Sequence, residues 1–375
     1  MSELKGLARA ADLSKNRSKR VEQLKDVGRK IFGYICCFAP PEIMHAAGIV
    51  PYRITGLPGD TTSEVDSQLE PYGCSYVRNC YAQAMKGRLD FLDGLVISHS
   101  CDMVQRLYGI WTYYRPLDYS RLINYPHQLY RWSQDFYKRE LIFFKESLEK
   151  YTGSRISEAT IRNSIAIFNR NRALIRELYR MRSGDKPALL SSELMDVLVA
   201  GGVLPAEEFG ELLAEVIEEV KNRPLKELPQ TRIMVWGCII DDPVFYRFIE
   251  EAGGQVVSDD TCIGTRTWNQ DVPDLEDPYE ALNKHYLVHF QCPRTDRGPG
   301  CQRFDYVVDL AGDNKADGVI GYTISFCDPH KLDYPDLRDY LKQKDIPMLL
   351  IDDNYSFSPE GALKTRIQAF IELLG

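Results

Sequence analysis

The stretch that decides the fold is residues 316–355, which read ADGVIGYTISFCDPHKLDYPDLRDYLKQKDIPMLLIDDNY. Two runs of apolar and β-branched residues, 317–327 and 347–355, each predict a buried strand. Between them, Asp328 and Pro329 suit the first turn of a helix, because proline tolerates the loss of its amide hydrogen there. A strand, a helix and a second strand in this order predict a parallel pair joined by a right-handed crossover.

The same alternation of strands and helices occurs toward both ends of the chain. Further strands are predicted at residues 30–40, 49–56, 93–100, 231–240 and 254–260. A helix with proline in its first turn follows the first of these strands, and residues 358–374 form a final amphipathic helix. We therefore predict an α/β protein with two flavodoxin-like or Rossmann-like parallel-sheet domains.

Helices alone are predicted between the two α/β parts, from about Tyr125 to Arg223. Ser157 is a candidate N-cap, and the helix after it has one apolar face, made by Ile161, Ile165, Phe168, Ile175 and Leu178. The predicted parts are therefore an N-terminal α/β domain (1–124), a helical region (125–228) and a C-terminal α/β domain (229–375).

The composition excludes several classes of function. The chain has 375 residues, of which 44% are hydrophobic and 27% charged, as in a globular protein of two or three domains. Its net charge of −8 argues against nucleic acid as the main partner, since phosphate binding needs a basic surface. The N-terminus is polar, and no segment approaches the roughly 18 uninterrupted apolar residues of a membrane span. We expect a cytoplasmic protein with no membrane association.

Three of the ten cysteines occupy positions that parallel sheets bring together. Cys101 and Cys327 each follow a predicted strand, and Cys74 lies at the start of the helix before the Cys101 strand. Ligands of open α/β sheets bind beyond the carboxyl ends of the strands, so one cleft between the two domains can receive all three thiols. Thiolates bind soft metals and iron–sulfur clusters, although the spacing is unlike that of a zinc site. The alternative is that the cysteines are small buried hydrophobic residues.

Residues 33–56, 74–111 and 316–355 resemble the subunits of 2-hydroxyacyl-CoA dehydratases and benzoyl-CoA reductases, and the resemblance extends to residues 241–266 and the helical middle. It implies an oxygen-sensitive iron–sulfur protein that takes low-potential electrons from a separate ATP-hydrolysing iron–sulfur activator. Family subunits hold a 4Fe-4S cluster with three cysteines, at positions that match Cys74, Cys101 and Cys327 here.

The remaining cysteines exceed what a single cluster needs. A related branch of the family carries an 8Fe-9S double-cubane cluster, held by about twice as many cysteines, and reduces small molecules. The candidates for additional ligands are Cys36, Cys80, Cys262, Cys292 and Cys301, with Cys37 adjacent to the first of them. Cys238 is predicted to be an ordinary core or strand-end residue.

Six polar residues are further site candidates. The candidate catalytic residues are His99, Glu42 and His45, for which a structural histidine and ordinary helix electrostatics are the alternative interpretations. The candidate ligands for the phosphates of coenzyme A are Arg53, Arg266 and Arg294, because a guanidinium pairs with phosphate in a bidentate fork.

The favoured function is the iron–sulfur catalytic subunit of a benzoyl-CoA reductase-type enzyme, which reduces a CoA thioester. This preference rests on the blocks CSYVRNC (74–80) and DDTCIGTR (259–266) and on the surplus cysteines. The alternatives are an (R)-2-hydroxyacyl-CoA dehydratase subunit acting through a ketyl radical, a double-cubane reductase of small molecules, an electron-storing subunit without its own chemistry, and a non-enzymatic structural protein. Because the glycine-rich phosphate motifs are absent, ATP is expected on the activator. The second expected partner is a homologous subunit or a second copy of this chain.

Overall fold

Two parallel four-stranded sheets form the framework of the protein. The computed structural model describes residues 5–224, 231–296 and 301–375. In this part of the chain, the sheets have the strand orders β2-β1-β3-β4 and β6-β5-β7-β8. The first contains β1 (Ile31–Ile35), β2 (Val50–Arg53), β3 (Gly94–Ser98) and β4 (Tyr119–Ile123), and the second contains β5 (Thr231–Gly237), β6 (Gly254–Asp260), β7 (Gly318–Ile324) and β8 (Met348–Asp353). The predicted α/β class with two parallel-sheet domains is confirmed.

Two strands end earlier than the apolar runs in the sequence predict, because the backbone turns out of the sheet. Cys36 has a φ of 71°, in the left-handed region, and β1 stops at the residue before it. Phe326 has a φ of 63° and follows the end of β7 by two residues. The cysteines after these strands therefore lie beyond the sheets. β4 was not predicted, because three of its five residues are half-buried and its sequence lacks an apolar run.

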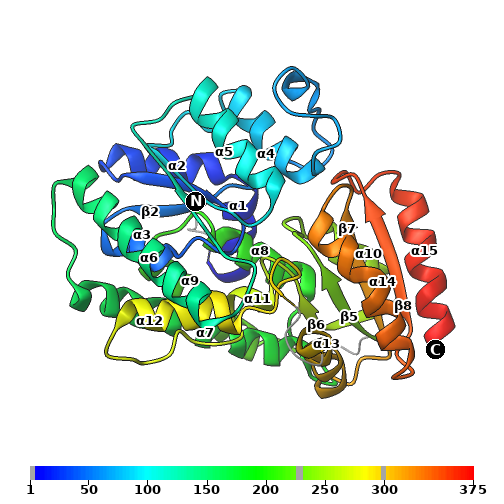
Figure 1. Ribbon diagram of the computed structural model, residues 1–375. Coiled ribbons are helices and arrows are strands. Elements are labelled where there is room, and N and C mark those ends of the chain that lie inside the picture. Colours follow the sequence, from blue (N-terminus) through cyan, green and yellow to red (C-terminus); the bar gives the residue numbers. More distant parts are fainter. Residues whose placement is uncertain (1–4, 225–230, 297–300) are drawn as a thin grey trace.

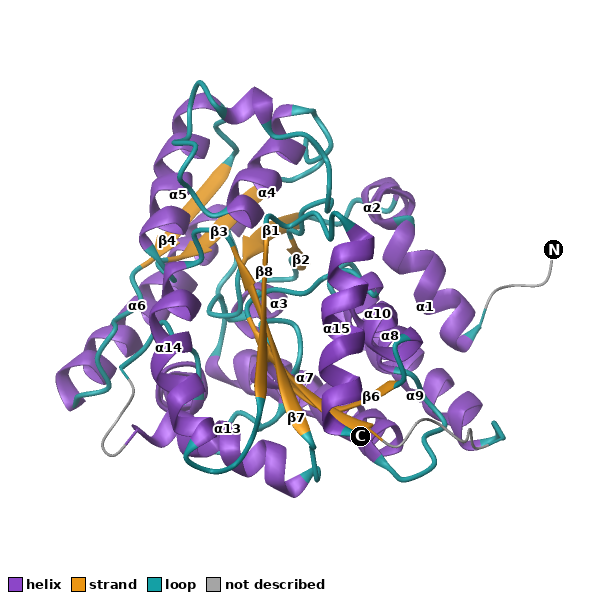
Figure 2. Cartoon of the chain, turned by 90° about the vertical axis from the view of Figure 1, so that its right-hand side faces the viewer, coloured by secondary structure: helices purple, strands orange, loops and turns teal. Residues whose placement is uncertain are grey.

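Helices cover the two sheets and fill the space between them (Figure 1). The helices of the first half are α1 (Gly6–Lys15), α2 (Arg17–Asp26), α3 (Pro41–Ala46), the 3-10 turn η1 (Ser63–Val65), α4 (Ser75–Met85) and α5 (Asp102–Tyr114). Those of the second half are α10 (Val244–Glu251), α11 (Thr265–Trp268), α12 (Pro278–Asn283), the π-helix η2 (Lys284–His289), α13 (Gln302–Asp313), α14 (Asp328–Lys342) and α15 (Glu360–Leu374). Helices α14 and α15 lie on opposite sides of the second sheet (Figure 2).

The middle of the chain is helical, with α6 (Arg131–Thr152), α7 (Glu158–Ser183), α8 (Ser191–Gly201) and α9 (Ala206–Lys221). Ser157 caps α7, since its side chain accepts a hydrogen bond from the Thr160 amide. The N-terminal helix α1 packs against α8 and α9, far from it in sequence. The predicted boundary between residues 228 and 229 lies outside the described residues.

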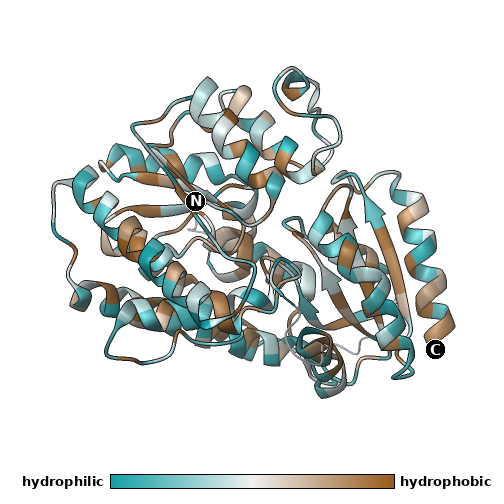
Figure 3. Cartoon of the chain, in the orientation of Figure 1, coloured by the Kyte–Doolittle hydropathy of each residue, from teal (hydrophilic) through white to brown (hydrophobic). Residues whose placement is uncertain are grey.

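One continuous apolar core joins the two sheets. It contains Ile35 and Leu95 from the first sheet and Val235 and Ile320 from the second, all fully buried. Hydrophobic residues accordingly concentrate along the central strands (Figure 3). Among the helices of the described residues, none is both long and apolar enough to cross a membrane.

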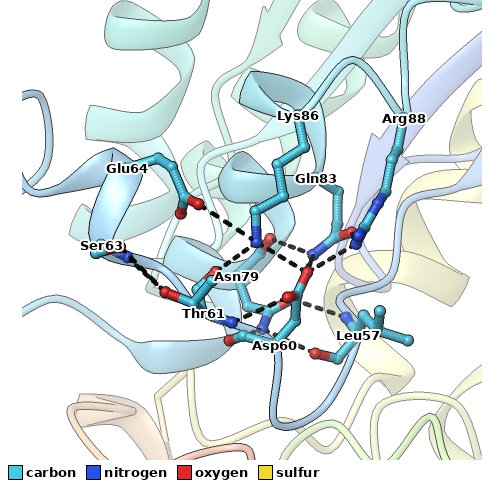
Figure 4. Close-up of polar contacts among 9 residues, drawn as sticks. All are labelled: Leu57, Asp60, Thr61, Ser63, Glu64, Asn79, Gln83, Lys86 and Arg88. Atoms are coloured by element: carbon cyan, nitrogen blue, oxygen red, sulfur yellow. Dashed lines mark hydrogen bonds and ion pairs between the residues drawn. The ribbon is translucent and has the colours of Figure 1, made fainter.

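A polar cluster fastens the loop after β2 to helix α4 (Figure 4). The Asp60 carboxylate lies 3.0 Å from Lys86 Nζ and 2.7 Å from Arg88 Nη1. The side chain of Asn79 bonds the backbone of Leu57 through both its amide nitrogen and its oxygen. Desolvation opposes ionisation of Asp60, but hydrogen bonds from Lys86, Gln83 and Arg88 outweigh it and lower the pKa of Asp60 to about 2. These contacts fix the position of α4, whose N-cap is Cys74.

Candidate functional site

A single cavity at the carboxyl ends of the strands collects cysteines from both domains. Its lining includes Cys36, Cys74, Cys101, Cys238, Cys262, Cys292 and Cys327. Apolar side chains such as Ile35, Phe38, Val104 and Ile324 form much of the remaining wall. We call this space the cysteine cavity.

Strand ends supply most of these thiols. Cys36 and Cys238 directly follow β1 and β5, Cys262 follows β6 by two residues, and Cys101 and Cys327 follow β3 and β7 by three. Three cysteines are also helix N-caps: Cys74 for α4, Cys101 for α5 and Cys327 for α14. Helix N-termini favour negative charge, so the local structure is suited to anionic sulfur.

Four of the cysteines form what we call the Cys74 group: Cys74, Cys101, Cys238 and Cys327. Interaction with the Cys238 thiol and burial raise the pKa of Cys327 well above its ordinary value, although Cys74 opposes this shift. Interaction with Cys327 and burial raise the pKa of Cys74 in the same way. Desolvation raises the pKa of Cys101 to about 12, although the amides of Val104 and Met103 oppose the shift.

The other three cysteines that line the cysteine cavity are Cys36, Cys262 and Cys292. Together with the neighbouring Cys37, which lies outside this lining, they form what we call the Cys36 group. The Sγ atoms of Cys36 and Cys37 are 4.0 Å apart. The hydrogen bond from Cys37 is the main reason why the pKa of Cys36 falls to about 6, and it also lowers the pKa of Cys262. The buried Cys292 thiol has a pKa raised to about 12 by desolvation.

A buried polar chain connects the two groups. Arg266 bonds both carboxylate oxygens of Asp260 at 2.8 Å, and its Nη1 lies 3.5 Å from the Cys262 sulfur and 2.9 Å from His330 Nε2. Arginine only donates, so His330 Nε2 accepts and the imidazole proton is on Nδ1. That Nδ1 lies 3.4 Å from the Cys327 sulfur, to which it donates. Burial lowers the pKa of His330 well below its ordinary value, and the imidazole is therefore neutral.

Two further arginines are buried beside the cysteines. Arg53 donates to the carbonyl of Cys262 at 2.8 Å, and Arg294 donates to the carbonyls of His99 and Tyr125. Neither forms an ion pair with a carboxylate in the described ranges, and Arg294 Nη1 and Ser100 Oγ, both in residues that line the cysteine cavity, have no hydrogen-bond partner there. The cavity wall therefore offers positive charge and free donors to an anionic group.

Comparison with known proteins identifies the family. A family model described as "2-hydroxyglutaryl-CoA dehydratase, D-component" matches residues 36–374. The chain belongs to this family.

Curated relatives in the 2-hydroxyglutaryl-CoA dehydratase D-component family have more than one named activity. A benzoyl-CoA reductase subunit of Thauera aromatica is 29% identical over 337 residues, 86% of this chain and 85% of its own length. The beta subunit of lactoyl-CoA dehydratase of Anaerotignum propionicum is 28% identical and covers 98% of both chains. The putative dehydratase subunit YjiM of Escherichia coli is 27% identical and covers 94% of both. The resemblance seen in the sequence is thus confirmed, and family members are reductase and dehydratase enzymes named as subunits.

Cys74, Cys101 and Cys327, the three predicted cluster ligands, all line one cavity in this structure. Cys36, Cys262 and Cys292 join them, whereas Cys80 and Cys301 do not. Cys80 is fully buried inside α4, and Cys301 packs against the separate core cluster around Trp236 and Phe304.

Sequence reasoning missed two thiols and a histidine. Cys238, predicted as an ordinary core or strand-end residue, lies at the end of β5 and also lines the cysteine cavity, and the Cys37 sulfur lies 4.0 Å from that of Cys36. The rule that ligands gather beyond strand ends applied to Cys238 as well and could have found it. No local pattern marked His330.

The candidate catalytic residues lie outside the lining of the cysteine cavity. Fully buried Glu42 bonds Arg172 and Tyr286, and His45 bonds Ser164 and Glu207 of the helical region. Helix α3, which carries both, packs against α7 and not toward the strand ends. His99 Nε2 lies 3.7 Å from Asp102, and its backbone carbonyl accepts from Arg294.

The thiol arrangement fits a polynuclear group better than a single ion. Within residues 5–224, 231–296 and 301–375, no set of three or more His, Cys, Asp and Glu side chains is close enough to hold one metal ion. The cysteines instead surround a cavity, and Arg294 Nη1 and Ser100 Oγ supply unpaired donors. Thiolates with additional hydrogen-bond donors are the environment of iron–sulfur clusters.

Proposed function

We propose that this chain is an iron–sulfur reductase whose cysteine cavity holds a double four-iron centre, and that it reduces a small molecule with electrons from an ATP-hydrolysing activator. The observation that carries this proposal is the number of thiols: seven cysteines line the cysteine cavity, and the sulfur of an eighth, Cys37, lies 4.0 Å from that of Cys36. Four thiols are the usual ligand set of one four-iron cluster. The three family positions alone would leave the Cys36 group without a function.

In this proposal each group would hold one four-iron unit, and such a centre supplies electron storage and transfer at low potential. Arg266, Arg53 and Arg294 would balance the negative charge of the thiolates, since these guanidinium groups are buried next to them. This role replaces the predicted binding of coenzyme A phosphates, because each arginine is at least nine-tenths buried and bonded to internal acceptors.

The apolar wall of the cavity has a second role. Ile35, Phe38, Val104 and Ile324 are at most 4% exposed and keep bulk water from the thiols. A dry site strengthens the hydrogen bonds from His330 and the arginines to sulfur and protects a reactive centre from side reactions. The activator remains part of the proposal because a phosphate-binding loop is absent from the sequence.

Iron and sulfide counts after anaerobic purification test the proposal. Two units predict roughly eight irons per chain, whereas a single cubane predicts roughly four. A protein with no iron after anaerobic expression and reconstitution would refute the iron–sulfur proposal. Activity is then measured with ATP and the activator on acetylene, benzoyl-CoA and a 2-hydroxyacyl-CoA, and reduction of the small molecule is the expected result.

The second candidate is the catalytic subunit of a benzoyl-CoA reductase-type enzyme with a single cluster. It is favoured by the 29% identity to the benzoyl-CoA reductase subunit of Thauera aromatica over 86% of this chain. Roughly four irons per chain together with reduction of benzoyl-CoA would select this candidate.

A further inference from the structure

A second cavity lies on the other side of the Cys36–Cys37 pair, and we call it the aromatic cavity. Its volume is about 140 Å³. Its apolar walls come from all parts of the chain and include Ile175, Leu198, Phe168, Phe209, Trp268 and Phe290. The helical region thus provides one side of this space, and the two α/β domains provide the rest.

The two cavities share a thin wall made of neighbouring residues. Cys36 lines the cysteine cavity and Cys37 lines the aromatic cavity. In the same way, Cys262 lines the cysteine cavity and Ile263 lines the aromatic cavity. Because the Cys37 sulfur lies 4.0 Å from that of Cys36, a molecule in the aromatic cavity would contact the Cys36 group directly.

The two arginines that line the aromatic cavity differ in how their charge is balanced. Arg172 is paired with Glu42 at 2.5 Å, and the hydroxyl of Tyr286 donates to the same carboxylate at 2.8 Å. Arg53 has no carboxylate partner in the described ranges and donates to the Cys262 carbonyl. The remaining walls are apolar and suit an uncharged ligand, since burying a further unpaired charge against them would be unfavourable.

Unpaired donors remain for orienting such a ligand. Arg53 Nε and Trp268 Nε1 are buried and have no hydrogen-bond partner among the described residues, and both residues line the aromatic cavity. The Tyr34 side chain lines the same cavity. A donor of this kind can bind one acceptor atom or the π-face of the ligand.

The volume of the cavity indicates the size of molecule that it can hold. An apolar cavity of about 150 Å³ in another protein binds benzene or xenon. The aromatic cavity has a similar volume and can therefore hold a benzene-sized molecule.

We infer that the aromatic cavity binds a small uncharged molecule, of about the size of benzene, against Cys37. Binding follows from the cavity itself, whereas its role as the substrate site rests on the proposed function. In that role, a substrate bound in the aromatic cavity would lie beside Cys37 of the Cys36 group.

Xenon is the probe that tests the binding. Crystals of the anaerobically purified chain under xenon pressure should show xenon in the aromatic cavity. The variant Leu198→Phe fills the cavity and should lose this site, whereas the matched variant Leu373→Phe, at a position 77% exposed in α15, should keep it. An empty cavity in the wild-type crystals, or xenon retained in Leu198→Phe, would overturn the inference.

A second measurement separates this inference from the proposed function and does not need the Leu198 variant to fold. Titration of the wild-type protein with benzene, followed by the NMR signals of the aromatic side chains around the cavity, should show saturable binding. Xenon and benzene bound by a protein without iron would refute only the proposed function. A fully iron-loaded protein that binds neither would refute only the aromatic cavity as a binding site. With the activator present, Leu198→Phe should raise the KM for the small substrate about tenfold with an unchanged iron count.

Discussion

The Cys74 group and the Cys36 group place different polar groups beside their thiols. Cys74, Cys101 and Cys327 are N-caps of three helices, and backbone amides face the thiols of Cys74 and Cys101. The Cys36 group relies on side chains: Arg53 contacts the Cys262 carbonyl, and Arg266 contacts the Cys262 sulfur. The outcome differs, since the pKa of Cys101 is raised to about 12 while that of Cys36 is lowered to about 6.

Because of this difference, the two groups release different numbers of protons when a metal binds. The raised pKa values of Cys74, Cys101 and Cys327 keep these thiols protonated near neutral pH, so they must release protons when metal binds. The Cys36 group already favours a thiolate before metal binds, because Cys37 and Arg53 stabilise the charge. Substitutions should therefore affect the two groups by separate routes.

The largest expected effect comes from removing one thiol from each group. Cys327→Ser and Cys262→Ser should each lower the iron content from roughly eight to roughly four per chain, because each leaves one four-iron unit without a ligand. Iron and sulfide analysis of anaerobically purified variants measures this, with circular dichroism to check the helical content. Cys80→Ser, at a buried cysteine outside the cavity, is the control and should keep its iron. Full iron retention in Cys262→Ser would show that the Cys36 group holds no metal.

The next effect concerns the side-chain support of the Cys36 group. Arg266→Gln leaves Asp260 buried without its cation and should lower the free energy of unfolding by about 3–5 kcal/mol, measured by urea denaturation. Arg266→Lys should restore part of this loss. The control is Arg176→Gln, which breaks the partly exposed pair with Asp271 and should cost at most about 1 kcal/mol. Equal losses in the two glutamine variants would contradict the role of burial.

A smaller effect is expected at the link between the groups. His330→Phe removes the donor to Cys327 and leaves Arg266 Nη1 without its acceptor, which should cost about 1–3 kcal/mol. The electron paramagnetic resonance signal of the unit bound by the Cys74 group should also shift, because hydrogen bonds to sulfur tune iron–sulfur clusters. His45→Phe is the comparison variant and should leave the signal unchanged. An unaltered signal in His330→Phe would mean that the imidazole does not act on the cluster.

The smallest effect is expected at Asp60, which fixes α4 and so the Cys74 N-cap (Figure 4). Its pKa is lowered to about 2 in the folded protein, so its contribution to stability is present above the ordinary carboxylate pKa and is lost as pH falls from about 4 to about 2. Because the carboxylate is partly exposed, Asp60→Asn should cost at most about 1 kcal/mol at neutral pH. Unfolding of wild type and variant at several pH values measures this, and the difference should shrink in acid. A difference that grew toward low pH would reverse the assigned sign.

Much of the fold could be predicted because buried parallel strands consist of consecutive apolar residues, which are visible in the sequence. The strand at residues 254–260 was predicted with the bounds that the structure has, while the half-buried edge strand β4 gave no such signal. Cys74, Cys101 and Cys327 could be placed in one cleft because strand ends and helix starts are local features.

The rest of the site depends on how the two domains meet. The contact of Arg266 with His330 joins residues 64 positions apart, and that of Arg53 with Cys262 joins residues 209 apart. Glu42 and His45 were predicted to face the cleft from consecutive turns of α3, but the packing of α3 on α7 turns them toward the helical region. No local pattern contains this information.

Both thiol groups draw their members from both sheets, and this has a thermodynamic consequence. Cys74 and Cys101 come from the first domain, and Cys238 and Cys327 from the second. A cluster bound by such a group is a covalent cross-link between the domains. By thermodynamic linkage, such a cluster stabilises the closed arrangement of the two domains to the extent that it binds this arrangement more tightly than an open one. Loss of the cluster to oxygen should therefore loosen the junction of the two domains.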